Sequence, residues 1–208
     1  EKEAGGTPRQ IHHTGFGMRD LHRVYSGPKY AQKYVQKAKQ VGIKIQTESA
    51  IIGWADSQSV HVSSPAGLEI IHAKAILLAT GCRERPRTAR LVPGFRPQGV
   101  YTTGSLQDFV HEHKMTVGKK AVIVGSELVS YSAVHTLKKA KCDVVRIVTD
   151  FPKHQVYMPY VPYKWWTADI LHRIPFSAST KVVEILGREK VSGVVIKQES
   201  SSNEETIP

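Results

Sequence analysis

The first indication of the fold is the stretch Ala73-Lys74-Ala75-Ile76-Leu77-Leu78-Ala79-Thr80-Gly81-Cys82-Arg83-Glu84-Arg85-Pro86. Its apolar run, residues 75–79, predicts a strand buried on both faces of a parallel sheet. We expect the strand to end at Thr80 and Gly81, because glycine permits close backbone approach and Pro86 excludes a central strand just beyond. Open α/β sheets bind ligands at the carboxyl ends of their strands, so Thr80 and Gly81 are candidate binding residues. An ordinary strand end is the alternative interpretation.

Composition bounds the class of protein. The 208 residues are 40% hydrophobic, which is enough for one or two cores. No run approaches the roughly 20 apolar residues of a membrane helix, so no membrane span is expected. The two cysteines, Cys82 and Cys142, form no C-x-x-C pair. We therefore expect neither a disulfide framework nor a zinc site, and a reducing, cytoplasmic location.

The net charge of +11 raises the possibility of a nucleic-acid partner. The basic residues are scattered, however, and their densest run, residues 83–90, is interrupted by Glu84 and Pro86. This pattern favours a solvated surface over a nucleic-acid platform. The ten histidines include no helical pair with a carboxylate in a metalloprotease pattern, so we predict no metal site, including at His12-His13 and at His111 with His113.

The first half of the chain alternates glycine-rich and periodic segments. Residues 5–26 lack periodicity and predict a long loop, and Gly27-Pro28 then opens a helix that Gly42 closes. Ile43 and Ile45 predict a short strand, and three further β runs are expected near residues 50–54, 59–62 and 68–72. This order, with the buried strand after it, is typical of the second half of a dinucleotide-binding domain.

The second half contains a βαβ unit. Glycine-marked stretches at residues 92–94 and 99–104 indicate a crossover between domains, and Ser105 with Asp108 resembles a capping box. Residues 121–124 predict a strand, 128–139 a helix and 144–148 a second strand, as in a Rossmann half. Residues 182–187 and 191–196 predict a hairpin, and residues 200–203 a turn or frayed end.

The glycine fingerprint of this unit is incomplete. A G-x-G-x-x-G pattern needs glycine at 125, 127 and 130, whereas the chain has Gly125, Glu127 and Ser130. Glu127 adds bulk and negative charge where a bare backbone would approach a pyrophosphate. Gly125, Ser126 and Glu127 are nevertheless the candidate contacts of this turn with a nucleotide. Asp150 is either a ribose-binding acid or an ordinary strand exit.

An aromatic, proline-rich segment follows at residues 151–166. Its aromatic residues are Phe151, Tyr157, Tyr160, Tyr163, Trp165 and Trp166. The segment is either a surface that binds a substrate or partner, or aromatic packing beneath a loop.

The sequence as a whole resembles flavoproteins with two dinucleotide-binding domains, the pyridine nucleotide-disulfide oxidoreductase-like superfamily. Within it, the chain is most similar to the alpha subunits of heteromeric sarcosine oxidase, opine oxidase, dye-linked proline dehydrogenase and hydrogen cyanide synthase. The resemblance rests on Gly5-Gly6, Gln10-Ile11, Gly15-Phe16-Gly17, Arg19-Asp20-Leu21, residues 79–87 and residues 99–104. It implies α/β architecture, with FAD/NAD(P)-binding three-layer Rossmann-like domains and antiparallel β-meanders. Residues 1–97 would form a partial FAD-binding domain and residues 98–208 an NAD(P)-binding-like domain.

The resemblance also implies roles for individual residues. Glu1 and Lys2 would contact the FAD ribose, Gly5 and Gly6 would provide backbone beside the isoalloxazine, and Ser49 would lie on the adenine side. Thr80 and Gly81 would pass near the ribityl or pyrophosphate. The chain would be an internal fragment, since the expected pyrophosphate-binding strand, turn and helix have no counterpart ahead of Glu1. The second site would be vestigial or hold NAD(P) or another adenine nucleotide.

Three functions follow as hypotheses. The first is an FAD-dependent oxidoreductase subunit that supports oxidation of a small amine or amino/imino acid with a partner beta subunit or in an oligomer. The second is an NAD(P)H-dependent FAD oxidoreductase, and the third is a non-catalytic nucleotide-binding scaffold. The missing C-x-x-C and C-x-x-x-x-C argue against disulfide reduction, and no residue is identified as a catalytic acid, base or nucleophile.

Overall fold

The computed structural model describes residues 1–164, 173–201 and 203–208, which form two compact units. Unit 1 comprises Glu1–Arg9 and Thr14–Arg83, and unit 2 comprises Gln10–His13 and Glu84–Pro208. The short helix η1, Thr7–Gln10, lies where the chain leaves unit 1. Trp165 and Trp166, the end of the predicted aromatic segment, lie outside the described residues.

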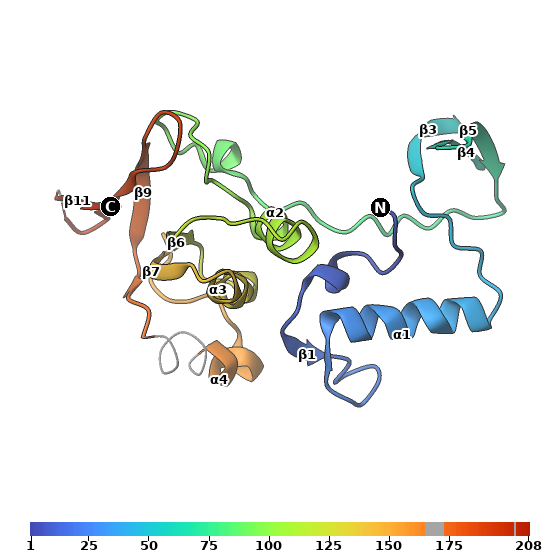
Figure 1. Cartoon of the computed structure of the whole chain (residues 1–208), viewed down its shortest axis with the longest axis horizontal. Coiled ribbons are helices and arrows are strands. Elements are labelled where there is room, and N and C mark those ends of the chain that lie inside the picture. Colours follow the sequence, from blue (N-terminus) through green and yellow to red (C-terminus); the bar gives the residue numbers. More distant parts are fainter. Residues whose placement is uncertain (165–172, 202) are drawn as a thin grey trace. The chain divides into compact units, whose positions relative to one another are not determined.

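Unit 1 contains a hairpin, a helix and a three-stranded meander (Figure 1). Strands β1 (Thr14–Phe16) and β2 (Tyr25–Ser26) pair antiparallel and lead into helix α1 (Gly27–Gln40). Strands β3 (Ala50–Asp56), β4 (Ser59–Ser64) and β5 (Gly67–His72) then form an antiparallel sheet in that order. The predicted helix and the three predicted β runs are thereby confirmed. Proline is tolerated in the first turn of α1 because backbone N–H groups there have no partner within the helix, so the N–H that proline lacks is not missed.

The strand predicted at Ile43 and Ile45 is wrong. Residues 43–49 form no strand, and both isoleucine side chains are exposed. No described strand pairs with this stretch, so alternating hydrophobicity alone does not give it β structure.

The buried strand predicted at residues 75–79 is also absent from the structure. Residues 73–86 form no strand, and Leu77 and Leu78 are 90% and 60% exposed. A strand buried on both faces needs paired neighbours and a layer covering each face. The described residues provide no strand that pairs with this segment, so its apolar run stays extended and exposed.

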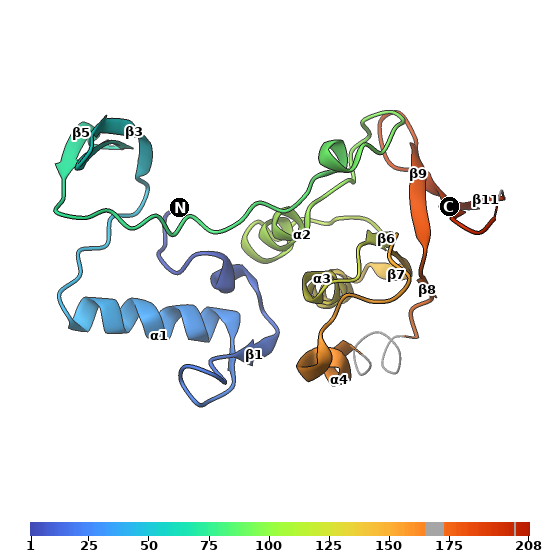
Figure 2. The same ribbon diagram turned by 180° about the vertical axis from the view of Figure 1, so that it is seen from behind.

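Unit 2 is built around a small parallel sheet and a separate antiparallel one. Strands β6 (Lys120–Val124), β7 (Asp143–Val148) and β8 (Phe176–Ser177) pair in parallel, and helix α3 (Leu128–Lys139) connects the first two. Strands β9 (Thr180–Leu186), β10 (Gly193–Gln198) and β11 (Glu204–Ile207) form the antiparallel sheet, of which β9 and β11 are labelled in Figure 2. The remaining elements are η2 (Arg87–Arg90), α2 (Thr103–Gln107), the π-helical turn η3 (Asp108–Glu112), η4 (Met158–Tyr160) and α4 (Val161–Lys164).

The main core of unit 2 lies where α3 covers the parallel sheet. Tyr131 and Val134 of α3 are fully buried with Ile147 of β7, and Leu106 of α2 joins the same cluster. Tyr160 and Tyr163 pack against this core, whereas Tyr157 is 62% exposed. The described part of the aromatic segment therefore combines core packing with surface exposure.

Most predicted elements of unit 2 are confirmed, including the βαβ unit and the β9–β10 hairpin. Two details differ. The N-cap of α2 is Thr102, whose hydroxyl accepts a hydrogen bond from the Ser105 backbone N–H, so the capping box predicted at Ser105 and Asp108 is wrong. Strand β11, which follows the predicted frayed tail, was not predicted and pairs with β10.

The segment ahead of residue 98 is attached to unit 2 by polar contacts. The Glu84 carboxylate accepts hydrogen bonds from the Thr103 and Gly104 backbone N–H groups, and Gly94 bridges to Ile185. The compact units therefore divide between residues 83 and 84. The predicted boundary between residues 97 and 98 separates two nucleotide-binding domains, whereas the division at residues 83 and 84 separates compact units. The domain boundary therefore stays a prediction.

Candidate nucleotide-binding sites

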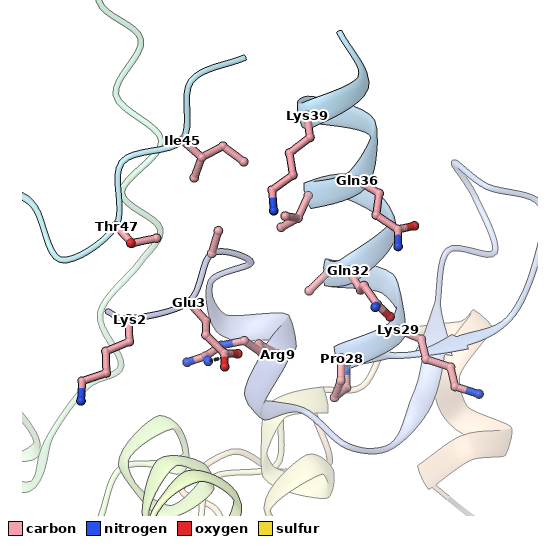
Figure 3. Close-up of a pocket in the computed structure, with 13 residues that line it drawn as sticks. Lys2, Glu3, Arg9, Pro28, Lys29, Gln32, Gln36, Lys39, Ile45 and Thr47 are labelled. Carbon is pink, nitrogen blue, oxygen red and sulfur yellow. Dashed lines mark hydrogen bonds and ion pairs between the residues drawn. The ribbon is translucent and has the colours of Figure 1, made fainter. Parts of the chain in front are cut away.

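A hollow of about 750 Å³ lies in unit 1 between the amino-terminal residues and α1 (Figure 3). Its volume is within the range of small-molecule sites. The charged side chains that line it are Lys2, Glu3, Arg9, Lys29 and Lys39. Four cations against one carboxylate give the hollow a positive character, which suits a phosphate-bearing ligand.

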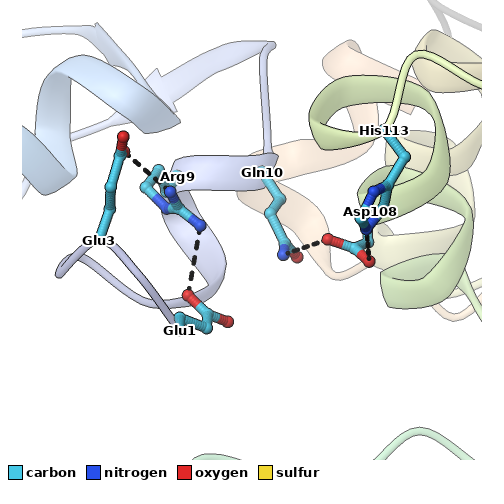
Figure 4. Close-up of polar contacts among 6 residues, drawn as sticks. All are labelled: Glu1, Glu3, Arg9, Gln10, Asp108 and His113. Atoms are coloured by element: carbon cyan, nitrogen blue, oxygen red, sulfur yellow. Dashed lines mark hydrogen bonds and ion pairs between the residues drawn. The ribbon is translucent and has the colours of Figure 1, made fainter. Parts of the chain in front are cut away.

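Arg9 organises the acidic residues at the start of the chain (Figure 4). Its Nη1 lies 2.8 Å from Glu3 Oε2, and its Nη2 lies 3.4 Å from Glu1 Oε2. The Glu1 backbone carbonyl accepts a 2.8 Å hydrogen bond from the N–H of Glu48, the residue directly before Ser49. The predicted ribose acid, Glu1, thus has one carboxylate oxygen facing a guanidinium, and Lys2 lines the hollow.

The two glycines predicted to lie beside a flavin form a tight turn. Gly5 has a φ of 128°, and a Cβ there would lie 3.0 Å from the Ala31 Cβ on α1. Gly6 has a φ of 61°, and its carbonyl accepts a 3.1 Å hydrogen bond from the Arg9 N–H. Glycine at residue 5 therefore permits both the left-handed conformation and the close approach to α1.

Ser49, Thr80 and Gly81 are not brought together with this hollow. The Ser49 hydroxyl donates to the Thr47 carbonyl at 2.9 Å, and Ser49 lines a second, mainly apolar hollow of about 400 Å³. Thr80 and Gly81 are exposed on the extended segment and line neither hollow. Their predicted placement at the end of a buried strand is wrong here, because that strand has no neighbour to pair with among the described residues.

In unit 2 the turn after β6 brings the predicted Gly125 and Glu127 together. The Gly125 N–H donates to the Val148 carbonyl at 2.8 Å, and its φ is 121°. Glu127 is the N-cap residue of α3, and its Oε2 lies 2.6 Å from the position that a Cβ on Gly125 would take. The Ser130 hydroxyl donates to the same oxygen at 3.2 Å. The Glu127 carboxylate therefore lies directly over the glycine.

This arrangement does not fit a bound pyrophosphate. The amino-terminal end of α3 carries partial positive charge and free N–H groups, which would favour an anion. The Glu127 carboxylate already lies there, so a phosphate would clash with it sterically and be repelled by its negative charge. Ser126 is fully buried, and its carbonyl accepts a hydrogen bond from the Gln155 N–H. Its hydroxyl has no hydrogen-bond partner within the described ranges.

Sequence reasoning missed two arginines beside these sites. Arg9 pairs with Glu1 and Glu3, and Arg90 places Nη2 3.6 Å from the same Cβ position at Gly125. For Arg9, the sequence does contain a signal, because two acidic residues, Glu1 and Glu3, lie within the same short segment. The position of Arg90 depends on how residues 84–97 fold back onto unit 2, which no local pattern reveals.

The described residues contain no group of three or more histidine, cysteine, aspartate or glutamate side chains that could hold a metal ion. Cys82 is exposed and Cys142 is buried, and burial raises the pKa of the Cys142 thiol. The two cysteines come from different units, and each is a free thiol. None of the helices in the described ranges combines the length and apolarity needed to cross a bilayer.

Comparisons with known proteins agree with this architecture. No curated protein matches the chain. Over the whole chain, the structure is similar to thioredoxin reductase of Lactococcus lactis, with a TM-score of 0.69, 15% identity and 64% of that chain covered. Over 95% of the chain it is similar to a bacillithiol disulfide reductase of Bacillus cereus, with a TM-score of 0.67, 16% identity and 61% of that chain covered.

A third similar structure is an NAD-dependent persulfide reductase of A. fulgidus, with a TM-score of 0.59, 18% identity, and 93% of this chain and 36% of that one covered. The chain thus spans less than two thirds of the length of each of these proteins. At these identities the likeness establishes the mixed α/β fold of FAD/NAD(P)-binding oxidoreductases. The profile of the pyridine nucleotide-disulphide oxidoreductase family matches residues 4–207, and the chain belongs to that FAD- and NAD(P)-binding family.

Proposed function

We propose that the chain is part of an FAD-dependent oxidoreductase subunit that supports oxidation of a small amine or amino/imino acid together with a partner subunit. Within the family, this matches the alpha subunits of heteromeric amine and amino-acid oxidoreductases that the sequence resembles. The observation that carries the proposal is the Glu127 carboxylate over Gly125. It supports a subunit whose flavin receives electrons from a substrate rather than from a nicotinamide nucleotide.

A nicotinamide nucleotide would bind at the turn between β6 and α3. A second dinucleotide would need its pyrophosphate at the start of α3, beside a bare glycine backbone. Glu127 and Ser130 stand where the fingerprint needs glycine, and their side chains are hydrogen bonded to each other. The site therefore favours an empty or altered nucleotide pocket, and reduction by NAD(P)H becomes the less favoured activity.

The cysteines argue against the other reaction common in this family. Disulfide reduction needs two thiols close enough to form a bond, about 5.5–6 Å between Cα atoms. Cys82 and Cys142 are the two cysteines of the chain, and no disulfide joins them. With no C-x-x-C pair, the proposal leaves the flavin as the redox group. The same thiols fit a reducing, cytoplasmic compartment.

Unit 1 would hold the FAD. The positive hollow beside Lys2 and Lys39 suits the phosphates of FAD. The Glu1 carboxylate would leave its ion pair with Arg9 and accept a hydrogen bond from the ribose hydroxyl. Gly5 and Gly6 would present backbone to the ring system. When bound, the flavin supplies the chemistry of accepting a hydride, and the chain's residues bind and orient it. Thr80, Gly81 and Ser49 would join this site only in a longer protein that pairs the extended segment.

One observation favours the alternative, an NAD(P)H-dependent FAD oxidoreductase. Arg90 Nη2 lies 3.6 Å from the Cβ position of Gly125, so a cation is available at the turn if Glu127 moves away. In that case Arg90 would bind a nucleotide phosphate, and the intact β6–α3–β7 unit would hold NAD(P) or another adenine nucleotide.

The experiment uses the full-length protein with its native partner, as wild type and as Glu127→Gly, with Glu189→Gln as a matched exposed control. Anaerobic titration with NADH, NADPH, proline and sarcosine is followed by flavin absorbance. We expect an amine or amino acid, but neither nucleotide, to bleach the wild-type flavin, and Glu127→Gly to bind nucleotide measurably more tightly. Rapid bleaching of the wild type by NAD(P)H would replace the proposal by the alternative. Bound nucleotide with no substrate-dependent reduction would favour a scaffold.

A further inference from the structure

The structure brings four histidines of unit 2 into one cluster, which we call the imidazole cluster: His12, His13, His111 and His135. Two of them come from the segment Gln10–His13, whose flanking residues on both sides belong to unit 1. The other two lie on η3 and α3. Imidazole side chains of the segment therefore contact η3 and α3 within unit 2.

The closest contact in the cluster is a stack of His12 on His111. Their ring centroids are 4.0 Å apart and the rings are 9° from parallel. His111 is 4% exposed, and its Nδ1 has no hydrogen-bond partner among the residues that the structure describes. Two stacked imidazolium ions at this separation would repel by about 4 kcal/mol at an effective dielectric constant of 20. The stack is therefore favourable only while at least one of the two rings is neutral.

The lysines beside the stack strengthen this requirement. Lys139 Nζ lies 3.2 Å from His12 Nδ1, and an ammonium can only donate, so His12 Nδ1 must accept. Lys114 Nζ donates to the His111 backbone carbonyl. Both cations disfavour a proton on the neighbouring rings.

His13 is held by a chain of two hydrogen bonds. The Gln107 amide donates to the Ser132 hydroxyl at 2.8 Å, and the Ser132 oxygen lies 2.9 Å from His13 Nε2. The serine hydroxyl has one proton and two lone pairs, so it donates to a neutral His13 Nε2 or accepts from a protonated one, according to the tautomer. The His13 ring also lies 5.6 Å from that of His135 and 5.8 Å from that of Tyr163.

Both signs of charge act on the cluster among the described residues. Among the groups that act on His12, Glu112 favours its charged form, whereas Lys139 and Lys114 disfavour it. Gln10 is anchored separately, since its amide donates to Asp108 Oδ1 at 3.1 Å, and Asp108 Oδ2 faces His113 Nε2 at 3.3 Å (Figure 4). Within the part of the chain that the structure describes, the charged and titratable groups beside the segment include Lys114, Lys139, Glu112, Asp108, His113, His135 and Tyr163.

We propose that the segment Gln10–His13 is a proton-sensitive attachment, held on η3 and α3 while the stacked imidazoles are neutral and released as the pH falls. The proposal rests on the stack, the lysine donors and the buried ring nitrogen, and it is independent of any flavin or substrate. Protonation of either stacked ring would create a cation beside the two lysines. Release lets both rings gain a proton in water.

The direction of the pH dependence follows from the attached state. Burial first, then the charges of His12, Lys139 and Lys114, lowers the pKa of His111 to about 4, and burial together with Lys139 and Lys114 lowers the pKa of His12. A released histidine titrates near 6.5. The attachment is thus complete above about pH 6.5 and weakens as the pH falls towards 4, by up to about tenfold per pH unit for each proton taken up.

The test is hydrogen exchange of the backbone amides of residues 10–13 in the full chain, corrected for the intrinsic pH dependence of exchange. Between pH 7.5 and 5.5 we expect the opening equilibrium to rise about tenfold from His111 alone. His111→Phe retains an aromatic stacking partner without a proton site, so its opening should rise less than that of the wild type over the same range, the remainder coming from His12. His61→Gln, on the exposed side of β4, should behave as wild type.

His12→Phe provides a second variant if His111→Phe does not fold. It removes only the part of the pH dependence that comes from His12 and from its charge beside His111, so its opening should rise less than that of the wild type but more than that of His111→Phe. A wild-type opening equilibrium that does not change between pH 7.5 and 5.5 would overturn the proposal. An unchanged tenfold rise in both variants would also overturn it, since the protons would then bind elsewhere.

Discussion

Glu84 gives the sharpest prediction about stability. Its Oε1 accepts from the Thr103 N–H at 3.1 Å and its Oε2 from the Gly104 N–H at 2.6 Å. Both donors lie in the first turn of α2, where backbone N–H groups have no partner within the helix. One half-buried carboxylate therefore anchors residues 84–97 to donors 19 and 20 residues further along the chain, at the start of α2.

The magnitude follows from these two bonds. Hydrogen bonds to charged groups contribute about 1.5–3 kcal/mol each, and a carboxylate at a helix amino terminus adds about 0.3–1 kcal/mol. Because the site is only half-buried, water replaces much of this after substitution. We expect Glu84→Ala to lower the free energy of unfolding by about 2 kcal/mol. Glu84→Gln keeps oxygen acceptance at one N–H without charge and should lose about 1 kcal/mol.

The assay is thermal unfolding by circular dichroism, with Arg85→Ala as the control, because Arg85 is an exposed neighbour. In a chain of this size, about 2 kcal/mol corresponds to a fall in melting temperature of about 4–8 °C. Arg85→Ala should shift it by less than about 1–2 °C. Equal shifts for Glu84→Ala and Arg85→Ala would refute the assigned contact, as would a Glu84→Gln variant less stable than Glu84→Ala.

Two further predictions concern unit 1. Leu77→Ser should change the free energy of unfolding by less than about 0.5 kcal/mol, because Leu77 is 90% exposed, whereas a buried strand would lose about 1.5–3 kcal/mol; urea unfolding distinguishes the two. Asp20→Asn should lower the pKa of Tyr34, which the hydrogen bond to Asp20 raises to about 12, back towards 10. Ultraviolet titration of the tyrosines measures this, and a Tyr34 titration unchanged by the substitution would contradict the contact.

The sequence predicted those parts of the fold in which local pattern and tertiary environment agree. The apolar strands and amphipathic helix of residues 119–148 have the periods of a βαβ unit, and the packing of α3 on β6 and β7 satisfies that pattern. The β3–β5 meander was predictable for the same reason, since its turns are marked by polar residues and glycine.

The same reasoning failed where pairing depends on distant partners. The apolar run around Leu77 has the pattern of a buried strand. Such a pattern shows that the segment could be buried in a sheet, but it does not show that a partner strand is present. Without a paired neighbour among the described residues, it stays extended. Strand β11 shows the converse, because its polar residues form a strand through pairing with β10.

For the candidate sites, the sequence by itself determined which chemical groups are present, but not where their side chains lie relative to one another. It determined that Glu127 and Ser130 replace fingerprint glycines, and that no C-x-x-C is present. Only the tertiary structure decided that the Glu127 carboxylate lies over Gly125, and that His12 stacks on His111 almost a hundred residues away. The physical reason is that residue type and spacing set local geometry, whereas contacts between remote side chains arise when the chain closes its loops and packs its core.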